Sequence, residues 1–209
     1  MTLDERPVPV ARRLHDSPSL HFREHFGEQA GLGDAPLGPA VAFGGSTAGM
    51  AECEEYMARL LGVRPGAPHL RLLASQQING PGDAVARHLG ATGPVETVSS
   101  ACASGTLAVG TALEWLREGE AEVVVAGGSD ALCLVTYGGF NALRSVDVRP
   151  CRPFHADREG LSIGEGAGVL VLERLENALA RGATPLAEVL GWGASCDAHH
   201  MTAPHPEGA

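Results

Sequence analysis

Cys102 is the residue of this 209-residue sequence whose type and position best suit covalent chemistry. It lies in the run Ser100-Ala-Cys-Ala-Ser-Gly105, after a short β-branched run at 95–99 and before an apolar pattern of helical period. A thiol at the start of a helix meets unpaired N–H groups and the positive end of the helix dipole, which favour the thiolate. A sharp strand-to-helix turn also lifts the side chain toward a pocket. These features indicate a reactive, nucleophilic thiol.

Small residues flank Cys102 and leave room for the turn and for a substrate: Ala101, Ala103, Ser104 and Gly105. The backbone N–H of Cys102 can itself stabilise the oxyanion of acyl transfer. A cysteine without such surroundings is more often a small, inert core residue. That interpretation applies to Cys53, Cys133 and Cys196, which we expect to be buried.

The elements that position this turn read as strand, helix, strand. The run 95–99 predicts one strand, the pattern from about 103 to 118 a helix, and the apolar run 122–126 a second strand ending in Gly127-Gly128. This order predicts a βαβ unit, with two parallel strands and a right-handed crossover.

Similar patterns continue along the chain. Further strands are expected at 41–44, 168–173 and 187–192, and helices at 48–61, 81–89 and 175–181. Continuous apolar strands are typical of a layered α/β sheet that is covered on both faces. Residues 1–40 read as an irregular N-terminal segment with several prolines and one short helix at 21–29, and residues 41–209 as one domain.

Composition narrows the possible functions. Apolar residues make up 44% of the chain, enough for a real core, and the net charge is −10, which disfavours nucleic acid and anionic membranes as partners. All 15 basic residues are arginine, so the chain offers no lysine for Schiff-base chemistry. The five scattered cysteines suggest neither a disulfide framework nor a zinc site. No apolar run reaches the roughly 20 residues of a membrane span, and 1–16 is not a signal peptide, so we expect a cytoplasmic protein.

Other chemistry-bearing side chains have plainer interpretations. His21 and His25 are spaced i, i+4, but no third ligand is evident, so no metal site is predicted. Structural or capping roles are expected for Asp157 and Glu165. Four glutamates are expected on solvated helix faces: Glu54, Glu55, Glu114 and Glu118. Near the end, one histidine is expected to be structural or to line a tunnel, with solvated neighbours, among His199, His200 and His205.

Several segments, in matching order, resemble the β-ketoacyl synthases, the condensing enzymes of fatty-acid and polyketide biosynthesis. The run 93–105 resembles their active-site segment, 149–160 with 164–173 their next signature, and 196–208 a segment lining the pantetheine tunnel. The resemblance implies an α/β, thiolase-like layered fold, of which this chain carries one half: the N-terminal, abbreviated half of the duplicated α/β/α core. It also implies a two-fold dimer.

The resemblance also implies the chemistry. An acyl group would pass from an acyl carrier protein or coenzyme A to Cys102, and a malonyl group would lose carbon dioxide and attack the thioester, a decarboxylative Claisen condensation. Phe140 matches an aromatic residue of the acyl pocket, and Thr202 a position close to the pantetheine arm. No cofactor is expected beyond the phosphopantetheine that carries the substrate.

Part of the family pattern falls outside this sequence. The resemblance covers about residues 41–209, whereas the family's two catalytic histidines, its lysine and its second oxyanion loop belong to the second copy of the fold. We therefore expect an acyltransferase of the synthase type that works with an acyl carrier protein and a complementary C-terminal-half subunit, in a homo- or hetero-oligomer. The alternatives are an acyltransferase or thioesterase that uses Cys102 without condensation, a non-catalytic scaffold that binds the carrier protein, and a gene fragment.

Overall fold

The computed structural model describes residues 39–208. The short helix predicted at 21–29 and nearly all of the predicted irregular segment lie outside the described residues. Within residues 39–208, no helix is long and apolar enough to cross a membrane.

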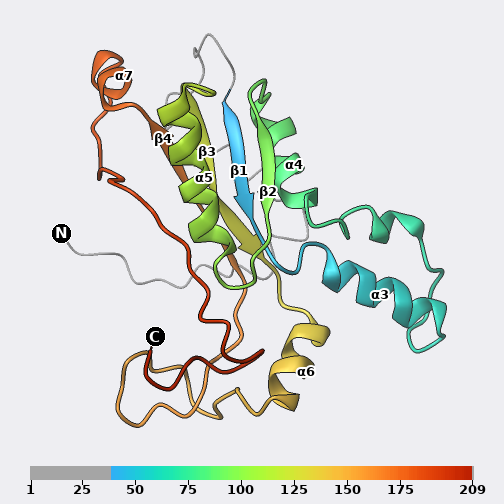
Figure 1. The fold of residues 1–209 in the computed structure, drawn as a ribbon. Helices are drawn as coiled ribbons and strands as arrows, with labels where there is room; N and C mark the ends of the chain where they lie inside the picture. Colours follow the sequence, from blue (N-terminus) through green and yellow to red (C-terminus); the bar gives the residue numbers. More distant parts are fainter. Residues whose placement is uncertain (1–38, 209) are drawn as a thin grey trace, which may run out of the picture.

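A four-stranded sheet forms the centre of the molecule (Figure 1). Its strands are β1 (Ala40–Gly44), β2 (Val95–Val98), β3 (Val123–Asp130) and β4 (Gly166–Glu173), in the order β2-β1-β3-β4. The first three are mutually parallel, with Val41 opposite both Val95 and Val125. β4 runs antiparallel to β3 and forms one edge. The predicted pair 95–99 and 122–126 is therefore parallel, with β1 between its members.

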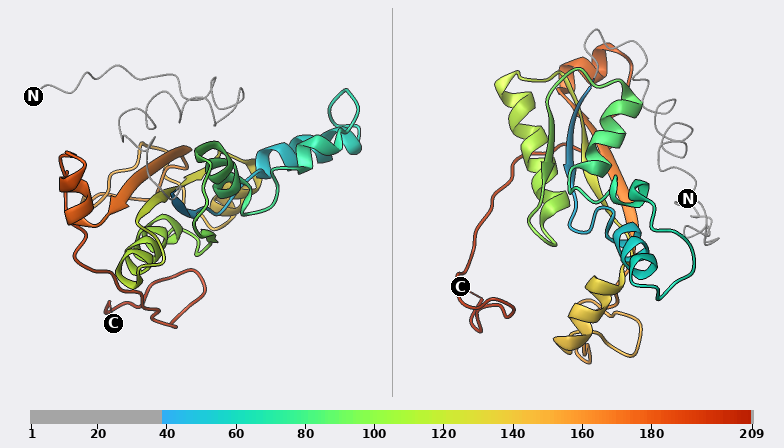
Figure 2. Two further views of the ribbon diagram at one scale, coloured as in Figure 1. Left: turned by 90° about the horizontal axis from the view of Figure 1, so that it is seen from above. Right: turned by 90° about the vertical axis from the view of Figure 1, so that its right-hand side faces the viewer.

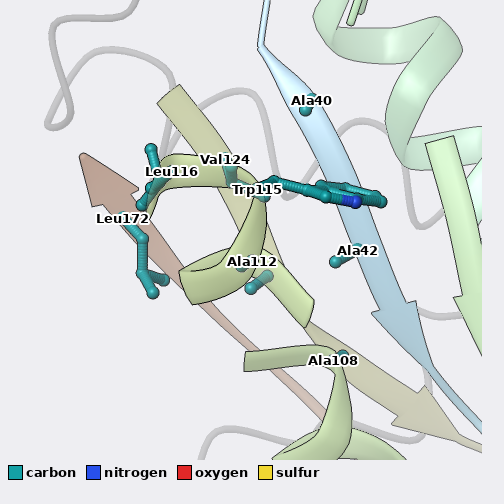
Figure 3. Packing of buried hydrophobic residues seen from close by; sticks show 9 residues of the cluster. Ala40, Ala42, Ala108, Ala112, Trp115, Leu116, Val124 and Leu172 are labelled. Atoms are coloured by element: carbon teal, nitrogen blue, oxygen red, sulfur yellow. The ribbon is translucent and has the colours of Figure 1, made fainter. Parts of the chain in front are cut away.

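Helix α5 (Ser104–Glu118) covers one face of the sheet. Side chains on one side of α5 pack on alternate residues of β1 and β3 (Figure 3). This cluster comprises Ala108, Ala112, Trp115 and Leu116 of α5, Ala40 and Ala42 of β1, Val124 and Ala126 of β3, and Leu172 of β4. Small residues dominate where helix and sheet meet, so the helix axis lies close to the strands. This close packing fixes the start of α5, and the turn before it, relative to the sheet.

Helix α4 (Gly80–Leu89) covers the opposite face over β1 and β2 (Figure 2, right). Val41 and Phe43, which alternate with the residues facing α5, pack there against Ala86. Pro81 lies in the first turn of α4, and Gly90, at φ 61°, ends it in the left-handed conformation. The predicted helix at 81–89 and its two end signals are thus confirmed.

The remaining predicted helices are confirmed with small shifts of their ends. They are α3 (Met50–Leu60) and α7 (Leu175–Ala180). Strand β3 extends past its predicted end through Gly127-Gly128 to Asp130, because β4 pairs with it along its whole length. Two elements were not predicted: the 3-10 turn η5 (Leu70–Leu73) and helix α6 (Leu134–Ala142).

The strand predicted at 187–192 is wrong. The chain there pairs with no strand among residues 39–208. It runs instead along α5, where the Trp192 indole N–H donates to Glu114 (2.9 Å) and Arg117 donates to the Leu190 carbonyl (2.8 Å). The prediction of a fully buried strand at 168–173 is also wrong. Leu172 is buried against α5, but Leu170, two residues away on the same face of this edge strand, is 53% exposed.

Candidate functional site

The carboxyl ends of the three parallel strands lie at one edge of the sheet, where the turn that carries Cys102 also lies (Figure 1). β1 leads there into Ser46 and Thr47, β2 into Cys102, and β3 ends at Asp130. In open α/β sheets this edge is where the loops of successive strands converge and where ligands bind. The topology therefore brings together residues from three distant stretches of sequence.

Cys102 is solvent-exposed in a tight turn between β2 and α5. Ala101, directly before it, adopts φ 47°, a left-handed conformation that disfavours any residue with a Cβ. The turn is closed by the Ala103 N–H, which donates to the Ser100 carbonyl (3.0 Å), and by the Ser104 N–H, which donates to the Ala101 carbonyl (3.2 Å). The structure therefore has the predicted sharp strand-to-helix turn, with a strained residue directly before the exposed thiol.

Ser104, the first residue of α5, stabilises this turn. Its side chain is buried, and its hydroxyl donates to the Ala101 carbonyl (2.6 Å) while accepting the Ser100 N–H (2.8 Å). One side chain thus satisfies a backbone donor and a backbone acceptor on either side of the strained residue. From the sequence, Ser104 was treated only as a small neighbour, although serine hydroxyls commonly bond to nearby backbone groups.

A second set of bonds ties the Cys102 turn to the loop after β1. The exposed Ser46 hydroxyl donates to the Ala101 carbonyl (3.0 Å). Asp130, at the end of β3, accepts with one carboxylate oxygen the N–H groups of Ser46 and Thr47 (both 2.7 Å) and the Thr47 hydroxyl (2.9 Å). Asp130 therefore holds the loop whose serine supports Ala101. The predicted strand ended before Gly127-Gly128, so the sequence did not place Asp130 at the strand end, where its carboxylate reaches the neighbouring loop.

Two glycines allow the backbones to approach this closely. A Cβ on Gly44, the last residue of β1, would lie 2.4 Å from the Ser104 carbonyl carbon. A Cβ on Gly128 would lie 2.5 Å from the Gly44 carbonyl oxygen. Contacts this short with backbone atoms cannot be relieved by moving a side chain. The end of β1 can therefore contact the start of α5 and the end of β3 this closely only because Gly44 and Gly128 carry no side chain.

Phe140, the predicted acyl-pocket residue, lies half-buried on helix α6. The start of α6 is held by Glu54 of α3, whose carboxylate accepts the N–H groups of Leu134 (2.9 Å) and Val135 (2.6 Å). The prediction that Glu54 faces solvent is therefore wrong, because it caps another helix. Glu165 accepts the Leu132 N–H (3.1 Å), which confirms its predicted structural role.

The other glutamates expected on solvated faces differ among themselves. Glu55 is half-buried and accepts from Arg59 at 2.7 Å and from Arg64, and these bonds lower the pKa of its carboxyl. Glu114 accepts the Trp192 indole N–H, as described above. Glu118 is exposed, as predicted. Of the cysteines expected to be buried, Cys133 is buried, Cys53 is half-buried and Cys196 is exposed.

Thr202, the predicted tunnel residue, lies exposed in a loop near the end of the described chain. Asp197 closes this loop: its carboxylate accepts the N–H groups of His199 (3.1 Å) and His205 (3.0 Å), which hold its pKa below the ordinary value. The His200 ring nitrogen Nδ1 accepts the Thr202 N–H (3.1 Å). The Asp197 carboxylate and the His200 ring therefore hold this loop together.

The loop at 144–162 is organised by Asp147, a carboxylate whose side chain is only 1% exposed. The Arg149 N–H donates to it (2.8 Å) and so does the Arg152 guanidinium (3.2 Å). These bonds lower the pKa of the Asp147 carboxyl, and the bond from the Arg149 backbone N–H has the largest effect. Asp157, for which a structural role was predicted, accepts from Arg152 with its backbone carbonyl (2.7 Å).

The three predicted site residues lie on three separate elements. Within residues 39–208, no hydrogen bond joins Cys102 to Phe140 or to Thr202, so the roles of these three residues stay predictions. An open hollow lies away from them, beside α3 and η5, and is lined by Arg59, His69, Arg71 and Leu72. In the described part of the chain, no group of three or more His, Cys, Asp or Glu side chains is placed to hold a metal ion.

Comparison with known proteins identifies the same family as the sequence motifs. The family described as "Beta-ketoacyl synthase, N-terminal domain" matches residues 28–178. Nodulation protein E of Rhizobium meliloti is 49% identical over 125 residues, which cover 59% of this chain and 31% of that protein. The 3-oxoacyl-[acyl-carrier-protein] synthase 2 of Staphylococcus aureus is 44% identical over 126 residues, covering 57% of this chain and 31% of the synthase.

Solved structures agree on the fold. The ishigamide ketosynthase/chain length factor superposes with a TM-score of 0.79 at 38% identity, over 87% of this chain and 46% of that one. The ketosynthase AntDE, in complex with the type II polyketide acyl carrier protein AntF, superposes with a TM-score of 0.70 at 31% identity, over 79% of this chain and 45% of that one.

The predicted thiolase-like α/β fold is confirmed by these ketosynthase structures. The chain spans about a third of the length of the curated relatives and about half of the solved ketosynthase chains. The matched segment contains the exposed thiol at the strand-to-helix turn and the helix that carries Phe140. By sequence match and by fold, this chain belongs to the β-ketoacyl synthase family, whose N-terminal domain it carries.

Proposed function

We propose that this chain is the nucleophile-bearing part of a β-ketoacyl synthase and that Cys102 accepts the acyl group. The observation that carries the proposal is the exposed Cys102 thiol, held at the carboxyl edge of the sheet by a strained turn that the Ser104 hydroxyl stabilises. A fixed, accessible thiol before a helix N-terminus suits attack on a thioester carbonyl.

In the loading step, the Cys102 thiolate attacks the carbonyl carbon of an acyl thioester. The carbon–sulfur bond to the pantetheine sulfur breaks, and that thiol leaves with the proton that Cys102 gave up. The backbone N–H of Cys102 is proposed as one donor to the oxyanion that forms in between. Phe140 is proposed to line the acyl chain and Thr202 to lie beside the pantetheine arm.

In the condensing step, a malonyl thioester loses carbon dioxide, and the carbanion left behind attacks the carbonyl carbon of the Cys102 thioester. A new carbon–carbon bond forms, the bond to Sγ breaks, and Cys102 leaves as the thiolate, ready for the next loading step. This step needs groups that stabilise the enolate during decarboxylation. We propose that two histidines and a lysine from a complementary C-terminal half supply them.

An acyl carrier protein is the proposed donor of both substrates. The AntDE:AntF complex supports this kind of partner, because its ketosynthase superposes on this chain and its title names a carrier protein bound to that ketosynthase. The ishigamide structure, a ketosynthase/chain length factor, supports a hetero-oligomeric assembly in the same way.

The proposal is tested by assaying condensation with this chain alone and with a polypeptide that carries the C-terminal half. Acyl and malonyl carrier-protein thioesters are supplied, and the carbon–carbon product is followed by mass spectrometry. Product is expected only when both polypeptides are present, and Cys102→Ala should abolish it. Condensation at full rate by this chain alone would contradict the need for a second half.

The same assay separates the alternatives. Release or transfer of the acyl group through Cys102 without a carbon–carbon bond would select an acyltransferase or thioesterase. Absence of any Cys102 adduct, even with both polypeptides present, would select a scaffold that only binds the carrier protein.

A further inference from the structure

Helix α6 is held to the rest of the molecule mainly at its first turn. None of its nine residues, Leu134–Ala142, is buried, and Leu134 and Val135 are 71% and 60% exposed. Cys133, directly before the helix, is buried, and its thiol bonds only locally, to the Thr136 hydroxyl (3.0 Å). Figure 1 shows α6 projecting beyond the carboxyl edge of the sheet. Packing of its own side chains therefore contributes little to its orientation.

Side chains from other elements instead hold the backbone at the start of α6. The Ala131 N–H donates to the Thr47 hydroxyl (3.2 Å), and the Leu132 N–H donates to Glu165 (3.1 Å). Glu54 then accepts two consecutive N–H groups, one on each carboxylate oxygen, from Leu134 and Val135. Of these contacts, only the pair made by Glu54 lies within the helix itself.

A carboxylate bound in this way fixes both the position and the direction of a helix. The negative charge meets the positive end of the helix dipole, and two bonds to adjacent N–H groups prevent the pivoting that one bond would allow. Phe140 lies six residues beyond Leu134, or about 9 Å along the axis at the usual helical rise. A tilt of about 15° at the first turn would move the ring by about 2 Å, more than the length of a carbon–carbon bond.

We infer that Glu54 is a positioning residue that sets, through α6, where Phe140 stands and hence which acyl chain lengths Cys102 accepts. The inference rests on the proposed function, since it assigns a specificity role within the same site. Glu54 lies on α3 and acts only through the helix that it caps. Nothing in its sequence surroundings separates it from the neighbouring Glu55.

The test compares Glu54→Ala and Glu54→Gln with Glu55→Gln as a matched control. Glu55 lies on the same helix but bonds Arg59 and Arg64, so its loss should leave α6 in place. Acetyl, hexanoyl and dodecanoyl coenzyme A are supplied to the full chain, with the C-terminal half present, and Cys102 loading is followed by intact mass. Hydrogen–deuterium exchange over 131–142 reports the state of α6 independently.

For Glu54→Ala we expect the ratio of dodecanoyl to acetyl loading to change by about tenfold, the effect of about one methylene of apolar contact. Acetyl loading should stay within about twofold of wild type, and exchange should rise at the start of α6. Glu54→Gln keeps one strong acceptor, so its loading ratio and its exchange should lie between those of wild type and Glu54→Ala. This variant also provides the test if Glu54→Ala does not fold. Glu55→Gln should change neither readout.

Two results would overturn the inference. One is a fall in loading that is equal for all three acyl chains, which would show only a structural role. The other is an unchanged ratio in the Glu54 variants while exchange over α6 rises, which would show that α6 does not set chain length. Failure of the wild-type chain to load any acyl group would instead overturn the proposed function, and the chain-length role with it.

Discussion

At the scale of single residues, the position of Cys102 is set mainly by the contacts of its neighbours in the turn. Ala101 takes up the backbone strain, Ser104 bonds on both sides of it, and Ser46 adds a third bond from another loop. Each of these contacts can be removed separately. The turn therefore yields predictions that do not depend on catalysis.

Ala101→Val should destabilise the protein by about 1–3 kcal/mol, because a β-branched residue tolerates the left-handed region poorly. Urea denaturation measures the change. Ala101→Gly, which relieves the strain at φ 47°, should be neutral or stabilising. A valine variant as stable as wild type would show that the turn relaxes to another conformation in solution.

Ser104→Ala should lower the free energy of unfolding by about 1–2 kcal/mol, because loss of the buried hydroxyl breaks two hydrogen bonds, one from the Ser100 N–H and one to the Ala101 carbonyl. Ser46→Ala is the matched control: it removes a bond to the same carbonyl, but from an exposed hydroxyl, and should cost well under about 1 kcal/mol. Equal effects of the two substitutions in thermal or urea unfolding would contradict the buried lock assigned to Ser104.

Asp147 makes the 144–162 loop sensitive to acid. Because its pKa is lowered in the folded state, its contribution to stability is complete above the ordinary Asp value of about 3.9 and is lost as pH falls through the folded value. We expect protection of this loop from hydrogen exchange to be constant at neutral pH and to fall in acid. Asp147→Asn should lose protection at neutral pH and lack this acid transition. An unchanged loop in that variant would contradict the assignment.

At the scale of elements, the site depends on how closely β1 approaches the start of α5. Gly44→Ala should destabilise the protein by about 2–3 kcal/mol, because the added methyl group meets backbone atoms that cannot move aside. Gly164→Ala, where a Cβ would meet nothing within 4 Å, is the control and should change stability little. Urea denaturation measures both. Similar stability of the two variants would mean that strand and helix can separate without loss.

The elements also show what the sequence could and could not predict. The strands and helices around Cys102 follow from local signals: a β-branched run, helical periodicity and closing glycines. The exposure of Leu170 and the path of 187–192 depend on whether a strand has a neighbour, which no local pattern records. Helix α6 was missed because Gly138 and Gly139 weaken its helical signal, and Glu54 compensates from a distant element.

The residues of the candidate site also fall into those that local sequence predicts and those that it does not. Cys102 was predicted because its turn is local in sequence. Asp130, Ser46 and Glu54 were not, because they act on backbone groups about 50 to 85 residues away. Such bonds are visible only once the sheet order places the ends of β1, β2 and β3 side by side.

At the scale of the whole molecule, much apolar surface is uncovered over residues 39–208. Leu186, Val148 and Phe154 are 98–99% exposed, and Trp192 is 46% exposed. Surfaces of this kind usually mark sites of association. We expect the chain to be oligomeric by light scattering, alone or with its C-terminal half. A stable monomer at micromolar concentration would count against this expectation.

The central claim, that Cys102 carries the acyl group, is tested most directly by finding where an acyl group attaches. The chain, with its C-terminal half present, is incubated with an acyl thioester, and the modified peptide is located by tandem mass spectrometry. Cys151 and Cys196 are also exposed and serve as internal controls. We predict one hydroxylamine-sensitive acyl group on Cys102, absent in Cys102→Ala and retained in Cys151→Ala and Cys196→Ala. An acyl group spread over all three cysteines, or one that persists in Cys102→Ala, would contradict the claim.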